Sequence, residues 1–125
     1  MMIDSTVMID VMRQKPAARN YLESIGEILS ISRIVWMEIV AGCQNKLELV
    51  WSMKMVNSLG LQVVEIDIEM SQIAGTLFEK YYHSHGLGIT DALIAAAAID
   101  KGESLATHNV KHFNFIKNLN LTVPY

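Results

Sequence analysis

The fold is decided by residues 86–113, GLGITDALIAAAAIDKGESLATHNVKHF. The apolar run between Thr90 and Lys101 predicts a helix, and Gly102 is a residue that commonly ends one. The following segment, Ser104–Thr107, is short and apolar and predicts a buried strand. A helix of this length that leads into such a strand is typical of the crossover unit of a parallel sheet.

The rest of the chain alternates in the same way. Short apolar segments predict strands at Met1–Asp4, Ile28–Ile31, Gln62–Ile66 and Leu121–Val123. Helical spacing predicts helices at Val7–Arg13, from Pro16 to Ile25, from Ser32 to about Ala41, at Leu47–Leu59, and from about Asp67 to Tyr81. We therefore predict one α/β domain over residues 1–125, with a mostly parallel central sheet and helices on both faces.

Bulk composition narrows the function classes. The chain has 125 residues, 51% of them hydrophobic, and a formal net charge of −3, which excludes a broadly cationic nucleic-acid binder. Its single cysteine, Cys43, cannot form an internal disulfide and is expected in the core. The N-terminus lacks the basic leader of a signal peptide, and no apolar run is long enough to span a bilayer, so we expect a soluble cytoplasmic protein.

Three isolated carboxylates stand in apolar surroundings. Asp4 lies between MMI and VMI, Glu38 lies inside IVWMEIVA, and Asp91 is the only charged residue from Gly86 to Ile99. An unpaired buried carboxylate is costly, and Arg33, the one cation near Glu38, lies off the helical i+3 and i+4 positions. A shared divalent ion would compensate all three, and oxygen ligands favour Mg²⁺ or Mn²⁺.

Each acid also has a simpler interpretation. Asp4, or Ser5 beside it, could cap the helix that follows. Glu38 could lie on a solvent-facing stripe, and Asp91 could complement a helix dipole from the first turn. Their joint occurrence favours a shared site, and because Asp4 and the Thr107–Asn109 segment both follow predicted strands, they are expected at one edge of the sheet.

These residues resemble a known family. MMIDSTVMIDVMR (1–13), SRIVWMEIVAG (32–42) and residues 86–113 are similar, in order, to segments of PIN-domain ribonuclease toxins of the VapC group. The resemblance implies a PIN-like three-layer fold and a metal-dependent endoribonuclease toxin that inhibits translation. It also implies Mg²⁺ or Mn²⁺ as the cofactor. Catalytic positions fall on Asp4, Glu38, Asp91 and Asn109, metal ligands on the first three of these, and supporting positions on Ser5, Thr6 and Thr107.

Two positions depart from the family pattern. Asn109 stands where many members have Asp, so it contributes one negative charge less toward a second ion. His108 stands where many members have Arg after the threonine, so a fixed phosphate-binding cation is not expected there.

The resemblance also implies partners: a VapB-like antitoxin whose tail covers the acidic pocket, a second copy of the chain in a homodimer, and an RNA substrate, with tRNA or rRNA loops as plausible targets. DNA is expected only indirectly, through the antitoxin. Apolar surface on the first helices, including Met8, Val11 and Met12, would serve protein contacts, with core packing as the simpler interpretation. Free cations that could guide RNA are Arg13, Lys15, Arg19 and Lys111.

Rival interpretations remain. The pairs His83/His85 and His108/His112 have spacings that a zinc hydrolase could use, although HExxH is absent. Phosphoryl-transfer domains need a second acid next to or two residues after the first, and here Ser5 and Thr6 follow Asp4. A dinucleotide-binding fold would need glycines after the first strand. A non-catalytic PIN-like module that only binds protein also stays open.

Overall fold

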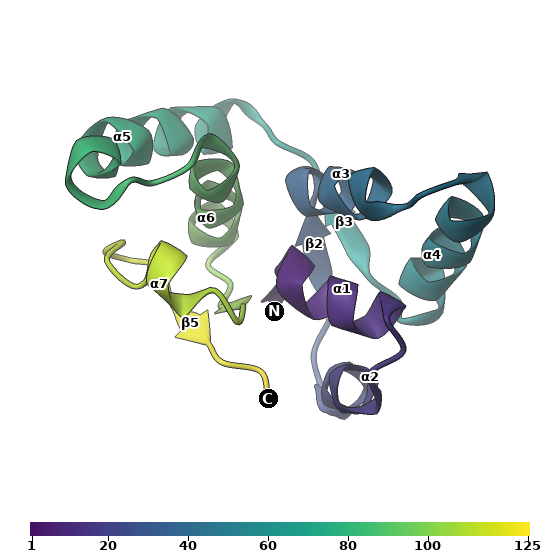
Figure 1. The fold of residues 1–125 in the computed structure, drawn as a ribbon. Coiled ribbons are helices and arrows are strands. Elements are labelled where there is room, and N and C mark those ends of the chain that lie inside the picture. Colours follow the sequence, from purple (N-terminus) through teal and green to yellow (C-terminus); the bar gives the residue numbers. More distant parts are fainter.

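The computed structural model describes residues 1–125 (Figure 1). Its strands are β1 (Met2–Ile3), β2 (Ser30–Ser32), β3 (Gln62–Val64), β4 (Leu105–Ala106) and β5 (Leu121–Thr122). Its helices are α1 (Ser5–Met12), α2 (Pro16–Ser24), α3 (Arg33–Gly42), α4 (Lys46–Ser58), α5 (Ile68–His85), α6 (Ile89–Lys101) and α7 (Val110–Phe113). Every predicted element is present. The strands are shorter than predicted, and the short helix α7 was not predicted.

The five strands form one parallel sheet in the order β3-β2-β1-β4-β5. Met2 pairs with Ser30 of β2 on one side and with Leu105 of β4 on the other. The chain proceeds outward from β1 through β2 to β3, then returns to the opposite side of β1 and continues outward through β4 to β5. The direction of winding therefore reverses between β1 and β4.

This reversal explains where the helices lie. Parallel crossovers are right-handed in nearly all proteins, so connections that run in opposite directions across a sheet leave their helices on opposite faces. Figure 1 shows α1 to α4 gathered on one side of the molecule and α5 to α7 on the other. The structure thus confirms the predicted α/β fold, and it creates a switch point beyond the ends of β1 and β4, where such folds bind ligands.

The core is continuous across the sheet and comprises 28 buried hydrophobic residues. The small side chains of Ala95–Ala98 are fully buried, which allows α6 to pack closely against its neighbours, α5 above all. Met8 and Val11 are buried on the inner face of α1, so the expectation that they contribute apolar contact surface is wrong. The simpler interpretation, core packing, holds for both.

Cys43 also differs from its prediction. It follows α3, is only partly buried, and its Sγ lies 3.2 Å from the carbonyl oxygen of Ile39 and 3.5 Å from Oγ of Ser52. It ends a helix instead of filling the core. No helix in the structure combines the length and the apolar character that crossing a lipid bilayer requires.

Candidate active site

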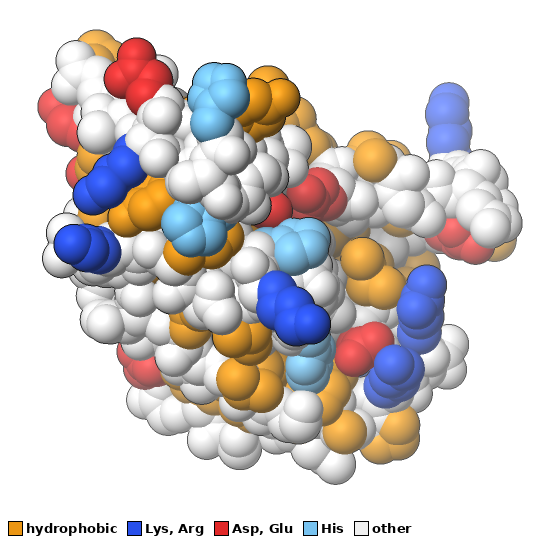
Figure 2. Space-filling view, turned by 60° about the vertical axis from the view of Figure 1, so that its left-hand side comes forward, with side chains coloured by type: hydrophobic (Ala, Val, Ile, Leu, Met, Phe, Trp, Pro, Cys, Tyr) orange, Lys and Arg blue, Asp and Glu red, His pale blue; other side chains and the backbone are white.

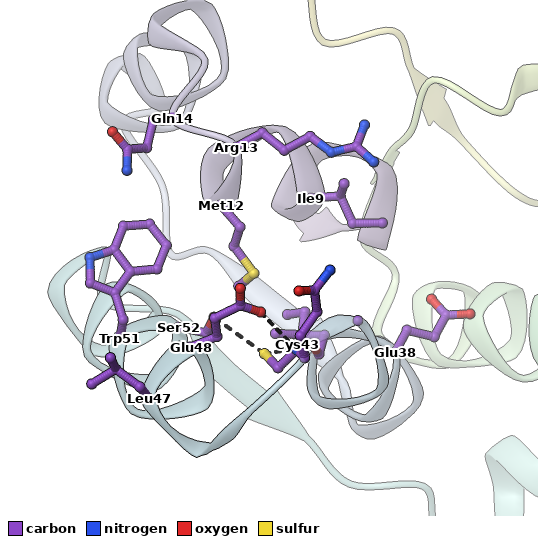
Figure 3. A pocket seen from close by; sticks show the side chains of 13 residues that line it. Ile9, Met12, Arg13, Gln14, Glu38, Cys43, Leu47, Glu48, Trp51 and Ser52 are labelled. Atoms are coloured by element: carbon purple, nitrogen blue, oxygen red, sulfur yellow. Dashed lines mark hydrogen bonds between the residues drawn. The ribbon is translucent and has the colours of Figure 1, made fainter.

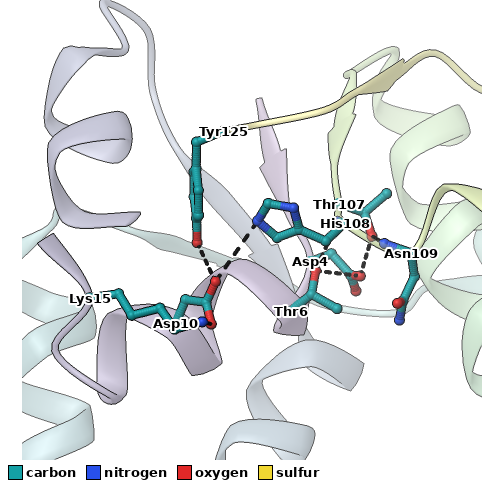
Figure 4. Close-up of polar contacts among 8 residues, drawn as sticks. All are labelled: Asp4, Thr6, Asp10, Lys15, Thr107, His108, Asn109 and Tyr125. Atoms are coloured by element: carbon teal, nitrogen blue, oxygen red, sulfur yellow. Dashed lines mark hydrogen bonds and ion pairs between the residues drawn. The ribbon is translucent and has the colours of Figure 1, made fainter. Parts of the chain in front are cut away.

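Asp4 lies at the switch point. It follows β1 directly, is 3% exposed, and stands at the N-cap position of α1, yet its side chain makes no capping hydrogen bond. Instead its Oδ2 accepts hydrogen bonds from Oγ1 of Thr107, at 2.6 Å, and from Oγ1 of Thr6, at 3.3 Å (Figure 4). The interpretation of Asp4 as a simple helix cap is therefore wrong.

The loop after β4 is fastened to β1 and α1 by these threonines. Thr107 is fully buried, and its Oγ1 also accepts a hydrogen bond from the backbone N–H of Asn109, at 3.0 Å. The backbone N–H of His108 donates to Oγ1 of Thr6, at 3.2 Å. The bonds from Thr107 to Asp4 and from His108 to Thr6 join residues about a hundred positions apart, and they fix the segment that carries Asn109 beside Asp4. The side chain of Asn109 is exposed and makes no hydrogen bond at the start of α7.

Glu38 reaches the same region from α3, a helix that begins where Oγ of Ser32 accepts the backbone N–H of Val35. Its Oε2 is buried and has no hydrogen-bond partner. Arg33 does not neutralise it, because its guanidinium pairs with Glu65 and lies over the ring of Trp36. A buried carboxylate oxygen without a partner is unusual and calls for a missing one.

Asp91 lies in the first turn of α6, as its helix-dipole interpretation also requires. Its Oδ2 lies 3.2 Å from Nδ1 of His112, a residue of α7. The structure thus adds to the site a histidine whose spacing in the sequence indicates only a zinc-type pair with His108. No pattern in the sequence could have connected it to Asp91.

The three carboxylates influence one another electrostatically. Burial raises the pKa of Glu38, the negative charges of Asp4 and Asp91 raise it further, and a contact with the Ser5 side chain opposes them. Burial likewise raises the pKa of Asp91, His112 lowers it, and Asp4 adds to the increase. None of the three forms an ion pair with a lysine or arginine. Acids from three separate elements therefore share one anionic region.

The donor set fits a hard divalent cation. All the donors are oxygens, one of them is buried and unpartnered, and the charges repel one another without a counter-ion. No three His, Cys, Asp or Glu side chains already stand close enough to enclose an ion, so the carboxylates converge without forming a closed cage. The paired histidines do not face a common centre either, because His108 faces Asp10 and His112 faces Asp91.

A second polar cluster borders the site. The ring of His108 points away from Asp4, toward Oδ2 of Asp10, at 3.9 Å, and lies edge-on to the ring of Tyr125 (Figure 4). Tyr125 donates its hydroxyl to Asp10 at 2.8 Å, and Lys15 pairs with Asp10 at 2.9 Å. These contacts lower the pKa of Asp10, with the Lys15 bond as the largest cause. Nε2 of His108 is buried there and forms no hydrogen bond.

The predicted RNA-guiding cations are only partly available. Lys15 is held by Asp10, and Arg19 pairs with Glu23 at 2.7 Å, so the expectation that these two are free is wrong. Arg13 and Lys111 form no ion pair. Figure 2 shows a face on which exposed Asp and Glu side chains (red) have His (pale blue) and Lys or Arg (blue) side chains as neighbours.

A groove of about 790 Å³ runs between α1, α3 and α4 and ends at Glu38 (Figure 3). Its apolar lining includes Met12, Ile39 and the exposed Leu47 and Trp51. The groove therefore connects an apolar surface directly to one of the site carboxylates.

Comparison with known proteins agrees with this architecture. The family model described as PIN domain matches residues 1–116. Ribonuclease VapC19 of Mycobacterium tuberculosis is 34% identical over 122 residues, which span 94% of this chain and 95% of the relative. Ribonuclease VapC10 of the same organism is 32% identical over 123 residues, or 94% of this chain and 89% of the relative.

Solved structures show the same fold. A toxin–antitoxin complex from Klebsiella pneumoniae has a TM-score of 0.80 and 26% identity, and the match covers 99% of this chain and 97% of that one. VapBC2 from Rickettsia felis, bound to a DNA fragment from its promoter, has a TM-score of 0.83 and 25% identity, with 97% and 96% covered. By fold, length and matched sequence, this chain belongs to the PIN-domain family, in its VapC group.

Proposed function

We propose that this chain is an endoribonuclease that uses Mg²⁺ or Mn²⁺ to hydrolyse RNA phosphodiester bonds, and that it acts in the cytoplasm as the toxin of a toxin–antitoxin pair. The observation that carries the proposal is the electrostatic effect that Asp4, Glu38 and Asp91 have on one another, although they lie far apart in the sequence and have no lysine or arginine partner. Two relatives with similar sequences are named ribonucleases, which supports RNA as the substrate.

Each residue has a distinct role in this proposal. Asp4 and Asp91 would hold the ion directly, and Glu38 and Asn109 would hold it directly or through water. A divalent ion bound there would supply a nucleophilic water and neutralise charge on the scissile phosphate. Oε2 of Glu38 has no hydrogen-bond partner in the protein, so it is available to accept a hydrogen bond from the attacking water. Thr107 and Thr6 hold Asp4 in one orientation.

The products follow from in-line attack by water with the 3′ oxygen as leaving group, which gives a 5′-phosphate and a 3′-hydroxyl. Single-stranded loops of tRNA or rRNA are suitable substrates because their phosphates and unstacked bases are accessible. Cleavage of such RNA would inhibit translation.

The partner we propose is a VapB-like antitoxin. Two of the matched structures are toxin–antitoxin complexes, and the groove between α1, α3 and α4 offers an apolar surface that ends at the site. A chain segment in this groove would bury Trp51 and Leu47 and bring its end next to Glu38, which would block access of RNA.

The test is cleavage of a labelled RNA by the purified chain in Mn²⁺, with Asp4→Asn, Glu38→Gln and Asp91→Asn compared with wild type. Each variant removes one site charge, and losing several kcal/mol of charge stabilisation lowers the rate about 100-fold or more. Asp100→Asn is the matched control, since Asp100 is exposed near the other end of α6.

Cleavage by Asp91→Asn at the rate of Asp100→Asn would refute the proposed mechanism. A wild-type chain that binds an antitoxin but cleaves no RNA with Mn²⁺ present would instead be a non-catalytic binding module.

A further inference from the structure

His112 contacts the carboxylate of Asp91 from α7, an element that carries none of the three acids. Its Nδ1 lies 3.2 Å from Oδ2 of Asp91, and the two side chains are 56% and 24% exposed. The residue belongs to α7, which starts right after Asn109, so it joins the loop beyond β4 to the first turn of α6.

The two aspartates are held in the same way. Oδ2 of Asp4 accepts from Thr107 and Thr6, whereas its Oδ1 accepts no hydrogen bond. Oδ2 of Asp91 meets His112, and its Oδ1 likewise has no partner. In both cases the protein occupies one carboxylate oxygen and leaves the other free. This is the arrangement in which an outer hydrogen bond orients a carboxylate that binds through its second oxygen.

We propose that His112 is a positioning residue whose Nδ1–H holds Oδ2 of Asp91, so that Oδ1 is presented to the divalent ion. This inference rests on the function proposed above and adds a residue to it. The effect needs a hydrogen-bond donor at the place of Nδ1 and does not need a histidine charge. A substitute for His112 that places a donor there should therefore keep the affinity for the ion, and a substitute without such a donor should lose it.

Asparagine and glutamine make this distinction. The amide nitrogen of asparagine is two bonds from Cβ, as Nδ1 of histidine is, while the amide nitrogen of glutamine is three bonds away, as Nε2 is. His112→Asn therefore keeps a donor facing Asp91, whereas His112→Gln moves it and His112→Ala removes it. His83→Ala is the matched control, because His83 is exposed on α5 and contacts no carboxylate.

The experiment measures the Mn²⁺ dissociation constant of the full chain from the electron paramagnetic resonance signal of the free ion. Alongside it run RNA cleavage and a thermal melt without metal. Loss of an outer hydrogen bond to a ligand typically costs about 10- to 100-fold in metal affinity, and we expect this loss for His112→Ala and His112→Gln. His112→Asn should stay within a few-fold of wild type, and His83→Ala should equal it. The kcat should fall along with the affinity, while KM for RNA stays unchanged.

The inference is overturned if His112→Ala binds Mn²⁺ as tightly as His83→Ala, or if His112→Asn binds as weakly as His112→Ala. Wild type and Asp91→Asn are the controls for both results: wild type must bind Mn²⁺, and Asp91→Asn must not. A wild-type chain that fails to bind Mn²⁺ would refute the proposed function itself, and this inference with it.

Discussion

The bond between Thr107 and Asp4 should be a major contribution to both stability and site geometry, and Thr107→Val tests it. Valine keeps the branched shape, so no cavity forms at this fully buried position. It removes the 2.6 Å bond to a carboxylate that is 3% exposed, and it removes the acceptor of the Asn109 N–H at 3.0 Å.

The magnitude follows from these two bonds. A hydrogen bond to a charged group contributes about 1.5–3 kcal/mol, and a neutral one about 0.5–1.5 kcal/mol. Because Asn109 is exposed, water recovers part of the second loss, which leaves about 2–3 kcal/mol in all. The melting temperature of a chain of 125 residues falls by about 4–5 °C for each kcal/mol of lost stability. The loss of these two bonds therefore lowers the melting temperature by roughly 8–15 °C.

The assay is thermal melting followed by circular dichroism, with Thr76→Val as the control because Thr76 is exposed on α5. A double-mutant cycle with Asp4→Asn adds a second reading. A hydrogen bond to a neutral amide is roughly half as strong as one to a carboxylate, so Thr107→Val should cost less in the Asp4→Asn background. If Thr107→Val melts at the same temperature as Thr76→Val, the hydroxyl does not hold Asp4 and the account of the site geometry fails.

Glu38→Gln should abolish cleavage yet raise the melting temperature of the metal-free chain at pH 8. The folded-state pKa values of Glu38 and Asp91 are raised, so as the pH rises above their ordinary values of 4.5 and 3.8, the unfolded chain loses these protons first and stability falls. The higher melting temperature of Glu38→Gln should therefore disappear near pH 4. Saturating Mn²⁺ at pH 8 should stabilise wild type more than the variant. A metal-free variant that is less stable than metal-free wild type at pH 8 would contradict this reasoning about charge repulsion. Trp51→Ala should weaken binding of the proposed VapB-like antitoxin by about 30-fold or more, as truncating an aromatic anchor buried in a complex does, while cleavage without antitoxin stays unchanged. Calorimetry checks this, with exposed Val50→Ala as the control, and equal affinities for the two variants would place the antitoxin elsewhere.

Local sequence was sufficient for the elements of the fold. The apolar spacing of α6 and the glycine after it predicted that helix to within one residue, because a helix and its end depend on neighbours within one or two turns. The acids were found for a related reason: a lone carboxylate among apolar residues is costly wherever the chain folds. Glu38, with its unpartnered oxygen, agrees with that argument.

Local sequence failed where the same type of residue can serve in two different structural roles. Asp4 before a helix predicts a cap equally well, but its side chain bonds to Thr107, which lies 103 residues away. Met8 and Val11 have the apolar side chains of a contact surface, but both are buried in the core. Helix α7 is a single turn and too short to show any periodicity.

The sequence by itself therefore determined the alternation of strands and helices and the set of acids that need a common partner. Only the tertiary structure decided that His112 faces Asp91, that His108 turns to Asp10 and Tyr125, and that one oxygen of each aspartate stays free. These contacts depend on strand order and on the direction of each crossover. Both are set by packing of the whole chain, because an isolated segment carries no record of the segment that will lie beside it.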